Sequence, residues 1–242
     1  MSELSPEMIV VLGAFLAAFV AGASGFGDAL VAAAVWLHVL PPVEAAPLIV
    51  MTGVILHVFL LIRMRRKLDF KYLAPFLALG VIGVPVGTWL LQHLQAEPFK
   101  LAMGALLILY GGGLLIMSKS PVITSGGRVL DAAAGGVGGV LGGMAGISGI
   151  VPAVWCGLRG WPREQARGVT QPFILIMHGL AFASMAYAGL ITPQLTQNFL
   201  YALPAMALGA VVGIGCYTRL NEERFRRIVL AILAAAGMTL IV

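Results

Sequence analysis

The residues of this chain that could bind a ligand gather around two glycine-rich segments. The first reads ASGFGDALV and has at its centre Ser24, Gly25, Phe26, Gly27 and Asp28. The second reads AGISGIVPAVW and contains Gly146, Ile147, Ser148 and Gly149. Backbone N–H groups at a helix start, together with a serine hydroxyl, suit an anion. We therefore expect anion binding at a first tip (residues 24–28) and a second tip (residues 146–149); alternatively, the glycines only allow tight helix packing.

Titratable and polar side chains inside apolar stretches add proton chemistry. Asp28 lies deep in an expected membrane region, where a carboxylate is costly, so it is the candidate for a proton coupled to transport. Alternatively, Asp28 is simply the N-cap of the next helix. His57 and His178 could donate to an anion, carry a proton or serve only as packed, hydrogen-bonded core residues. Thr170 and Gln171 could face the same cavity, and we expect the anion to bind mainly at the second tip.

The elements that position these residues must be membrane helices. The chain has 242 residues, of which 60% are hydrophobic and 10% are charged, whereas a water-soluble domain has about 25% charged residues. No polar stretch is long enough for a soluble enzyme domain. Phosphate-loop, HExxH and GxSxG motifs are absent, and the two cysteines form no metal pair. We therefore predict an integral membrane protein that is not an enzyme and uses no cofactor or bound metal.

Eight apolar stretches cover most of the chain. Six have the length of one crossing: residues 43–62, 73–92, 99–117, 168–188, 196–216 and 226–242. The other two, residues 8–39 and 129–158, would be about 45 Å long as helices, which exceeds the ~30 Å hydrocarbon layer. Both contain a tip near the middle. We therefore expect each long stretch to be a broken-helix hairpin, giving 8 to 10 membrane segments in total.

The basic residues indicate how the chain is oriented. With two hairpins, the loops after residues 62, 117, 158 and 216 lie on one side and hold fourteen of the fifteen Lys and Arg residues, leaving only Lys100 opposite. Basic loops face the cytoplasm. Both termini are therefore expected outside, on the periplasmic face of the cell (inner) membrane. This orientation accounts for the basic loops without any nucleic-acid partner.

The two halves of the sequence repeat each other in inverted orientation. When the sequence is compared with itself at an offset of 121 residues, four identical pairs align: Gly22 with Gly143, Gly25 with Gly146, Pro41 with Pro162, and His57 with His178. At an offset of 126 residues, four further identical pairs align: Gly83 with Gly209, Gly87 with Gly213, Glu97 with Glu223, and Phe99 with Phe225. The loop after residue 62 has five basic residues and its equivalent at 189–195 has none, whereas the loop at 93–100 has one and its equivalent at 219–227 has four, which predicts opposite orientations. Inverted repeats that begin with an interrupted helix are typical of secondary transporters.

This arrangement resembles the sulfite exporter TauE/SafE family of membrane transporters over nearly the whole chain. The family motif is a glycine-rich turn followed by a proline, once per half. Gly146, Gly149 and Pro152 fit it, whereas the first half has Asp28 where a glycine is usual and Val31 where the proline would be. The resemblance implies transport of sulfite, organosulfonates or related anions across the plasma membrane.

The sequence as a whole predicts an all-α integral membrane protein of two inverted repeats, each a broken-helix hairpin followed by three transmembrane helices. The first repeat covers residues 1–118, a cytoplasmic linker covers 119–128, and the second repeat covers 129–242. We expect a permease for a small anion, coupled to protons or ions, with lipid as its surroundings and self-association left open. The alternatives are a cation or metal transporter using Asp28, His57 and His178, or a membrane scaffold that transports nothing.

Overall fold

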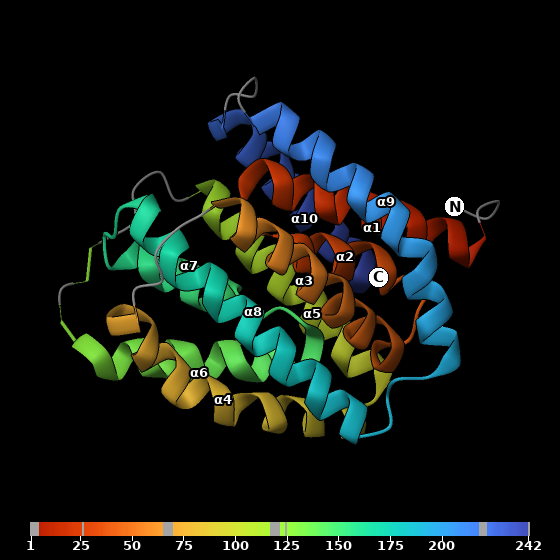
Figure 1. Ribbon diagram of the computed structural model, residues 1–242, viewed down its shortest axis with the longest axis horizontal. Helices are drawn as coiled ribbons and strands as arrows, with labels where there is room; N and C mark the ends of the chain where they lie inside the picture. Colours follow the sequence, from red (N-terminus) through yellow and green to blue (C-terminus); the bar gives the residue numbers. More distant parts are fainter. Residues whose placement is uncertain are drawn as a thin grey trace. The chain divides into compact units, whose positions relative to one another are not determined.

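A computed structural model describes residues 5–25, 27–64, 70–116, 122–123, 125–217 and 222–241. These described residues form ten α-helices and no β-strand (Figure 1). The helices are, in chain order, α1 (Pro6–Ser24), α2 (Asp28–Trp36), α3 (Pro42–Met64), α4 (Phe70–His93), α5 (Ala96–Ile116), α6 (Gly127–Ala145), α7 (Ile150–Leu158), α8 (Arg163–Tyr187), α9 (Pro193–Tyr217) and α10 (Glu222–Ile241). The predicted all-α class is therefore confirmed for this part of the chain.

Segments from both halves of the sequence combine in each of two compact units. Unit 1 comprises Met1–Thr52, Leu94–Ser118 and Thr192–Val242, and unit 2 comprises Gly53–His93 and Lys119–Ile191. Unit 1 thus holds α1, α2, α5, α9 and α10, whereas unit 2 holds α4, α6, α7 and α8. Helix α3 begins in unit 1 and ends in unit 2. Each unit therefore combines one broken helix with a packing partner from the other half of the sequence.

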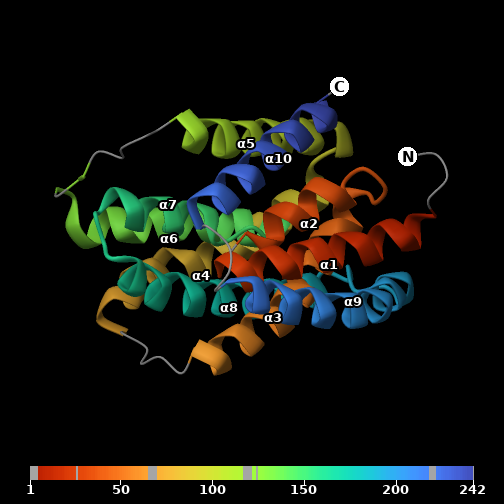
Figure 2. The ribbon, with the colours of Figure 1, turned by 90° about the horizontal axis from the view of Figure 1, so that it is seen from above.

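Both long apolar stretches are broken at the glycines of the tips. In unit 1, α1 ends at Ser24 with Gly25 as a left-handed C-cap (φ 84°), and α2 begins at Asp28. In unit 2, α6 ends at Ala145 with Gly146 as a left-handed C-cap (φ 71°), and α7 follows. Helices α2 and α7 have nine residues each and pack against α1 and α6, respectively (Figure 2). Nine residues span only about 14 Å, so neither can cross a membrane alone.

Glycines bring the backbones of α4 and α6 into contact in unit 2. A Cβ atom added at Gly87 would overlap the carbonyl oxygen of Val140, and one added at Gly83 would lie 2.5 Å from the carbonyl oxygen of Gly136. Small residues at these positions are what permit so close an approach. The packing alternative for glycine therefore applies here, away from the tips.

The same contacts recur between α1 and α9 in unit 1. A Cβ atom added at Gly213 would overlap the carbonyl oxygen of Phe19, and one added at Gly209 would overlap that of Phe15. Gly209 and Gly213 match Gly83 and Gly87 at the offset of 126. Their contacts match at the offset of 121, because Phe15 and Phe19 correspond to Gly136 and Val140. The two units thus contain one packing motif built twice.

The contacts run in the opposite direction as well. A Cβ atom added at Gly143 on α6 would overlap the backbone of Val84 on α4, and one added at Gly22 on α1 would lie 2.7 Å from the carbonyl oxygen of Ala210 on α9. These two pairs are also related by the offsets of 121 and 126. In each helix pair, glycines on both helices therefore lie where the backbone of the partner leaves no room for a Cβ atom.

Helices α5 and α10 pack against each other in unit 1 in a pattern that repeats within the pair (Figure 2). A Cβ atom at Gly111 would lie 2.5 Å from the carbonyl oxygen of Leu230, and one at Gly237 would lie 2.6 Å from that of Gly104. The offset of 126 converts the first contact into the second. Equivalent contacts of this kind are what an approximate two-fold axis through the pair would produce.

Six described helices are long and apolar enough to cross a membrane: Pro6–Ser24, Pro42–Ile62, Phe70–His93, Ala96–Ile116, Glu164–Tyr187 and Pro193–Cys216. Five of them coincide with predicted single crossings, and the sixth is the first limb of the first hairpin. Helix α10, predicted as a span over residues 226–242, is not among them, because charged residues occupy its first turns. The protein is accordingly a multi-pass membrane protein.

Candidate functional site

The second tip folds back sharply onto the end of α6. The Gly146 N–H donates to the carbonyl of Gly142 at 2.9 Å, and the Ile147 N–H donates to that of Leu141 at 3.3 Å. These two bonds, with Gly146 in a left-handed conformation, form the glycine-dependent helix end that lets a chain reverse direction. The sequence therefore positions Ser148 at the turn by placing glycine at position 146.

Ser148 is the buried hydroxyl of the second tip. Its side chain is 0% exposed, and its Oγ atom has no hydrogen-bond partner among the described residues. Gly142 makes room for it, because a Cβ atom there would lie 2.8 Å from Ser148 Cβ. A buried hydroxyl without a partner loses the hydrogen bonds that water would supply, which costs about 1–3 kcal/mol. Such a group suggests a ligand that supplies the missing partner.

Helix α7 begins directly after this hydroxyl. Gly149 is its N-cap and makes no side-chain hydrogen bond, and Ile150 is its first residue. The first N–H groups of a helix have no partner within that helix and carry the positive end of its dipole. Pro152, in the first turn, has no N–H to satisfy. The second tip thus combines helix N–H groups with a buried hydroxyl, which is the chemistry of an anion site.

His57 and His178 lie beside each other in unit 2. Their ring centroids are 5.6 Å apart with an angle of 28° between the ring planes, and each residue is 1% exposed. Gly53 on α3 leaves room for the ring of His178, because a Cβ atom there would lie 2.9 Å from His178 Cε1. His178 Nε2 is 2.8 Å from the carbonyl oxygen of Gly146. The pair is therefore joined directly to the second tip.

Gln171 and Thr170 occupy different roles in α8. Gln171 is 2% exposed, and its Oε1 atom lies 3.0 Å from Nδ1 of His57. Thr170 is 7% exposed, and its hydroxyl donates to the carbonyl of Ala166 at 2.9 Å, one turn earlier in the same helix. Gln171 thus belongs to the histidine cluster, whereas the Thr170 hydroxyl already has a partner in its own helix.

The first tip lies in unit 1. Gly25 N–H donates to the carbonyl of Ala21 at 2.7 Å, and the Ser24 hydroxyl donates to that of Val20 at 2.7 Å. Gly27, with φ 94°, is the N-cap of α2, and Asp28 is the first helical residue and 6% exposed. The alternative that Asp28 is the N-cap is therefore wrong by one position. Phe26, which the sequence places at the centre of this tip, lies outside the described residues.

A cavity of about 50 Å³ lies beside the first tip within unit 1. Aliphatic and aromatic side chains from α1, α2, α5 and α10 form most of its lining, and Ser24, Tyr110 and Arg226 add polar groups. A bare oxyanion is stable only where polar groups replace its water shell. The mostly apolar lining therefore suits a small oxyanion less well than the second tip does.

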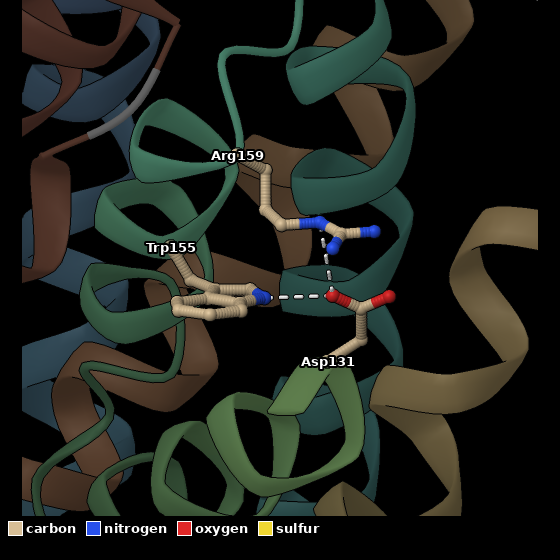
Figure 3. Close-up of polar contacts among 3 residues, drawn as sticks. All are labelled: Asp131, Trp155 and Arg159. Atoms are coloured by element: carbon tan, nitrogen blue, oxygen red, sulfur yellow. Dashed lines mark hydrogen bonds and ion pairs between the residues drawn. The ribbon is translucent and has the colours of Figure 1, made fainter. Parts of the chain in front are cut away.

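A buried carboxylate fastens α7 to α6 in unit 2. Asp131 on α6 is 4% exposed, and its Oδ1 atom accepts a hydrogen bond from Trp155 Nε1 at 2.7 Å and lies 3.7 Å from Arg159 Nε (Figure 3). Arg159 also lies 5.9 Å from the ring centroid of Trp161. Arg159, the C-cap residue of α7, is thus the charged partner of Asp131. This cluster fixes the end of α7 that lies away from the second tip.

The structure brings together only part of the predicted site. In unit 2 the second tip, His57, Gln171 and His178 form one connected cluster, whereas the residues of the first tip belong to unit 1 and are described there. Sequence reasoning missed the Asp131 cluster, although the lone carboxylate in an apolar stretch was a signal for it. Among the described residues, no three His, Cys, Asp or Glu side chains lie close enough together to hold a metal ion.

Comparison with known proteins identifies one family. The family model described as sulfite exporter TauE/SafE matches residues 10–240, which is nearly the whole chain. No curated protein and no solved structure matches this chain.

Proposed function

Because this chain belongs to the sulfite exporter TauE/SafE family, we propose that it is a secondary transporter for a small sulfur-containing anion such as sulfite or an organosulfonate. The substrate crosses the plasma membrane along the chain's own helices, driven by a proton or ion gradient. No bond of the substrate is made or broken. Family membership and the six apolar helices support the membrane transporter, and the second tip supports the choice of an anion.

The buried hydroxyl of Ser148 is the observation that carries the site assignment. Its Oγ atom has no described partner although the residue is fully buried, and the α7 N-terminus begins two residues later. A bound oxyanion would accept a hydrogen bond from this hydroxyl and from helix N–H groups, which are donors that a cation could not use. We place the substrate mainly at residues 146–149, with Gln171 and His178 beside it.

The repeated contacts support an inverted-repeat mechanism. Residues 1–118 and 129–242 form the two repeats in this proposal, because the glycine contacts of α1 with α9 match those of α6 with α4. Each repeat supplies one broken helix, and such repeats alternate the access of a site between the two sides of a membrane. In this proposal the basic loops face the cytoplasm, so both termini lie on the periplasmic face of the inner membrane.

Flux measurements with purified protein in proteoliposomes test the function. Sulfite, methanesulfonate, a small carboxylate and a divalent cation are compared as substrates, each with and without a pH gradient. We expect flux of sulfite, methanesulfonate or both. Flux of the divalent cation alone would overturn the anion proposal and favour the cation alternative.

The variant Ser148→Ala tests the site, with Ser184→Ala as the matched control. Ser184 lies on α8 in the same unit, is partly exposed and follows His178 by six residues. Loss of a hydrogen bond to a charged ligand weakens binding by about ten- to a hundredfold. Ser148→Ala should therefore raise the substrate concentration needed for half-maximal flux by that factor, without lowering the unfolding temperature, because no described group loses a partner. If Ser148→Ala and Ser184→Ala needed the same substrate concentration for half-maximal flux, Ser148 would not be part of the binding site.

A further inference from the structure

The stacked histidine pair of unit 2 has its hydrogen positions fixed by its partners. The carbonyl oxygen of Gly146 can only accept, so His178 Nε2 must carry the hydrogen of their 2.8 Å bond. Gln171 presents Oε1 to His57 Nδ1 at 3.0 Å, so Nδ1 carries a hydrogen there. Each neutral ring therefore already donates one hydrogen bond. A further proton would go to His178 Nδ1 or to His57 Nε2.

Other titratable groups on the surrounding elements lie toward the ends of their helices. Those whose side chains the structure describes are Glu44 in the first turn of α3; Lys71, Tyr72 and His93 near the two ends of α4; Arg128 and Asp131 early in α6; Cys156 on α7 and Arg159 at its C-cap; and Glu164, Arg167 and Tyr187 near the two ends of α8. Arg167 lies about three turns before His178 on the same helix, and Asp131 lies about four turns before Gly146 on α6. Cys156 is the titratable side chain closest in sequence to the second tip on α7.

Two charges on this pair would repel each other strongly. At the centroid distance of 5.6 Å and an effective dielectric constant of about 20, the repulsion disfavours the second positive charge by about a hundredfold. The two rings together therefore favour binding of one proton rather than two. Each protonation step is a property of the pair and not of either histidine alone.

The pair also links this proton to the anion site. A positive ring donates a stronger hydrogen bond to the Gly146 carbonyl than a neutral ring does. Gly146 begins the second tip, so the charge is placed beside the expected anion. Proton binding then raises anion affinity, and the reciprocal relation requires that the anion raise proton affinity by the same factor.

We propose that His57 and His178 together bind one proton, which enters and leaves the second tip with the anion, so that this protein is a one-proton anion symporter. The inference rests on the proposed function for the identity of the anion. With a monovalent anion the bound pair of charges is neutral, so a pH gradient drives transport and a membrane potential does not.

A proton count tests the site without any transport. The chain has four histidines, and His38 and His93 are exposed and serve as internal references. Imidazole ¹⁵N resonances of the full-length protein in lipid nanodiscs are followed from about pH 8 to about pH 5, the range in which histidines change charge. We expect the two buried rings to take up one proton in total. Uptake of two protons, or of none, would overturn the proposal.

Isosteric variants test the coupling. His178→Gln keeps an N–H donor near the position of Nε2 and so retains the hydrogen bond to the Gly146 carbonyl. His57→Asn keeps an N–H donor near the position of Nδ1 and so retains the hydrogen bond to Gln171. Neither amide side chain can bind a proton in this pH range. Methanesulfonate is the probe, because its own charge does not change in this pH range. For the wild-type protein, log apparent affinity should fall by about one per pH unit above the midpoint of protonation. The double variant should lose this dependence, whatever flux remains.

The outcomes separate this inference from the proposed function. If the wild-type protein exchanges no anion at any pH, the proposed function fails, while the proton count still decides whether the pair holds one proton. If exchange occurs but the double variant keeps the wild-type pH dependence, the symport inference fails alone. If Asp28→Asn abolishes that dependence and the double variant does not, the coupled proton belongs to Asp28.

Discussion

The closest backbone contacts of unit 2 predict a large effect for one methyl group. In Gly143→Ala, the new Cβ atom would lie 2.9 Å from Thr88 N and would overlap the carbonyl oxygen of Val84. Both are backbone atoms of α4, so no side chain can rotate away. Helix α4 must move from α6 or the contact must be strained, and overpacking of this kind costs about 1–3 kcal/mol. We take the upper end, about 3 kcal/mol, because backbone is the neighbour.

Gly179→Ala is the matched control for this change. Gly179 lies within α8 in the same unit, and a Cβ atom there would have no atom within 4 Å among the described residues. Both variants gain the roughly 1 kcal/mol by which alanine exceeds glycine in helix propensity. The difference between them therefore measures the contact alone. For a chain of this length, 3 kcal/mol corresponds to about 6–12 °C in Tm.

Thermal unfolding of the two purified variants in the same detergent, followed by tryptophan fluorescence, provides the measurement. Gly143→Ala should unfold about 6–12 °C below Gly179→Ala. Gly22→Ala, the equivalent change in unit 1, should show a shift of the same sign. Unfolding of Gly143→Ala within a degree or so of the control would refute the claim that this glycine is required by backbone contact.

Two further predictions concern buried carboxylates. Asp28→Asn should lower stability by about 1 kcal/mol, because it removes a negative charge from the first turn of α2. It should also leave the pH dependence of anion flux unchanged. Thermal unfolding and flux measurements across pH check these two results. Asp131→Asn should lower stability by about 1.5–3 kcal/mol, because the charged acceptor of Trp155 and Arg159 is lost. Glu223→Gln, which breaks only the exposed pair with Arg227, should change stability by less than 1 kcal/mol; equal effects of these two variants on Tm would contradict the burial argument.

The local features of the tips could be predicted from sequence because backbone geometry decides them. A chain that ends one helix and reverses needs a left-handed residue, and glycine is the residue that adopts this conformation without strain. Gly25 and Gly146 are left-handed C-caps as that reasoning requires. The offset of 121 likewise identified His57 and His178 as equivalent residues. Their direct contact needed the structure, since equivalence in sequence does not place two side chains together.

Side-chain environments could not be predicted in the same way. Tryptophans in membrane proteins are enriched near the ends of spans, but Trp36 is 0% exposed and donates from Nε1 to the carbonyl of Val10 at 3.1 Å. Gly13 makes this position available, because a Cβ atom there would overlap the indole. Residue type alone cannot distinguish a tryptophan at the lipid boundary from one in a core. The distinction depends on a glycine in a different helix.

Unit 1 contains both the first and the last helices of the chain, which has a consequence for biogenesis. Helix α1 is synthesised early, but its packing partner α9 follows only after α8 has been made. Unit 2 can assemble once α8 has emerged, because α4, α6, α7 and the end of α3 precede it. Contacts between distant parts of a chain form slowly, and domains complete in order of synthesis. We therefore expect unit 2, with the second tip, to fold first. The glycine face of α1 remains without its packing partner until the last two helices, α9 and α10, have been synthesised.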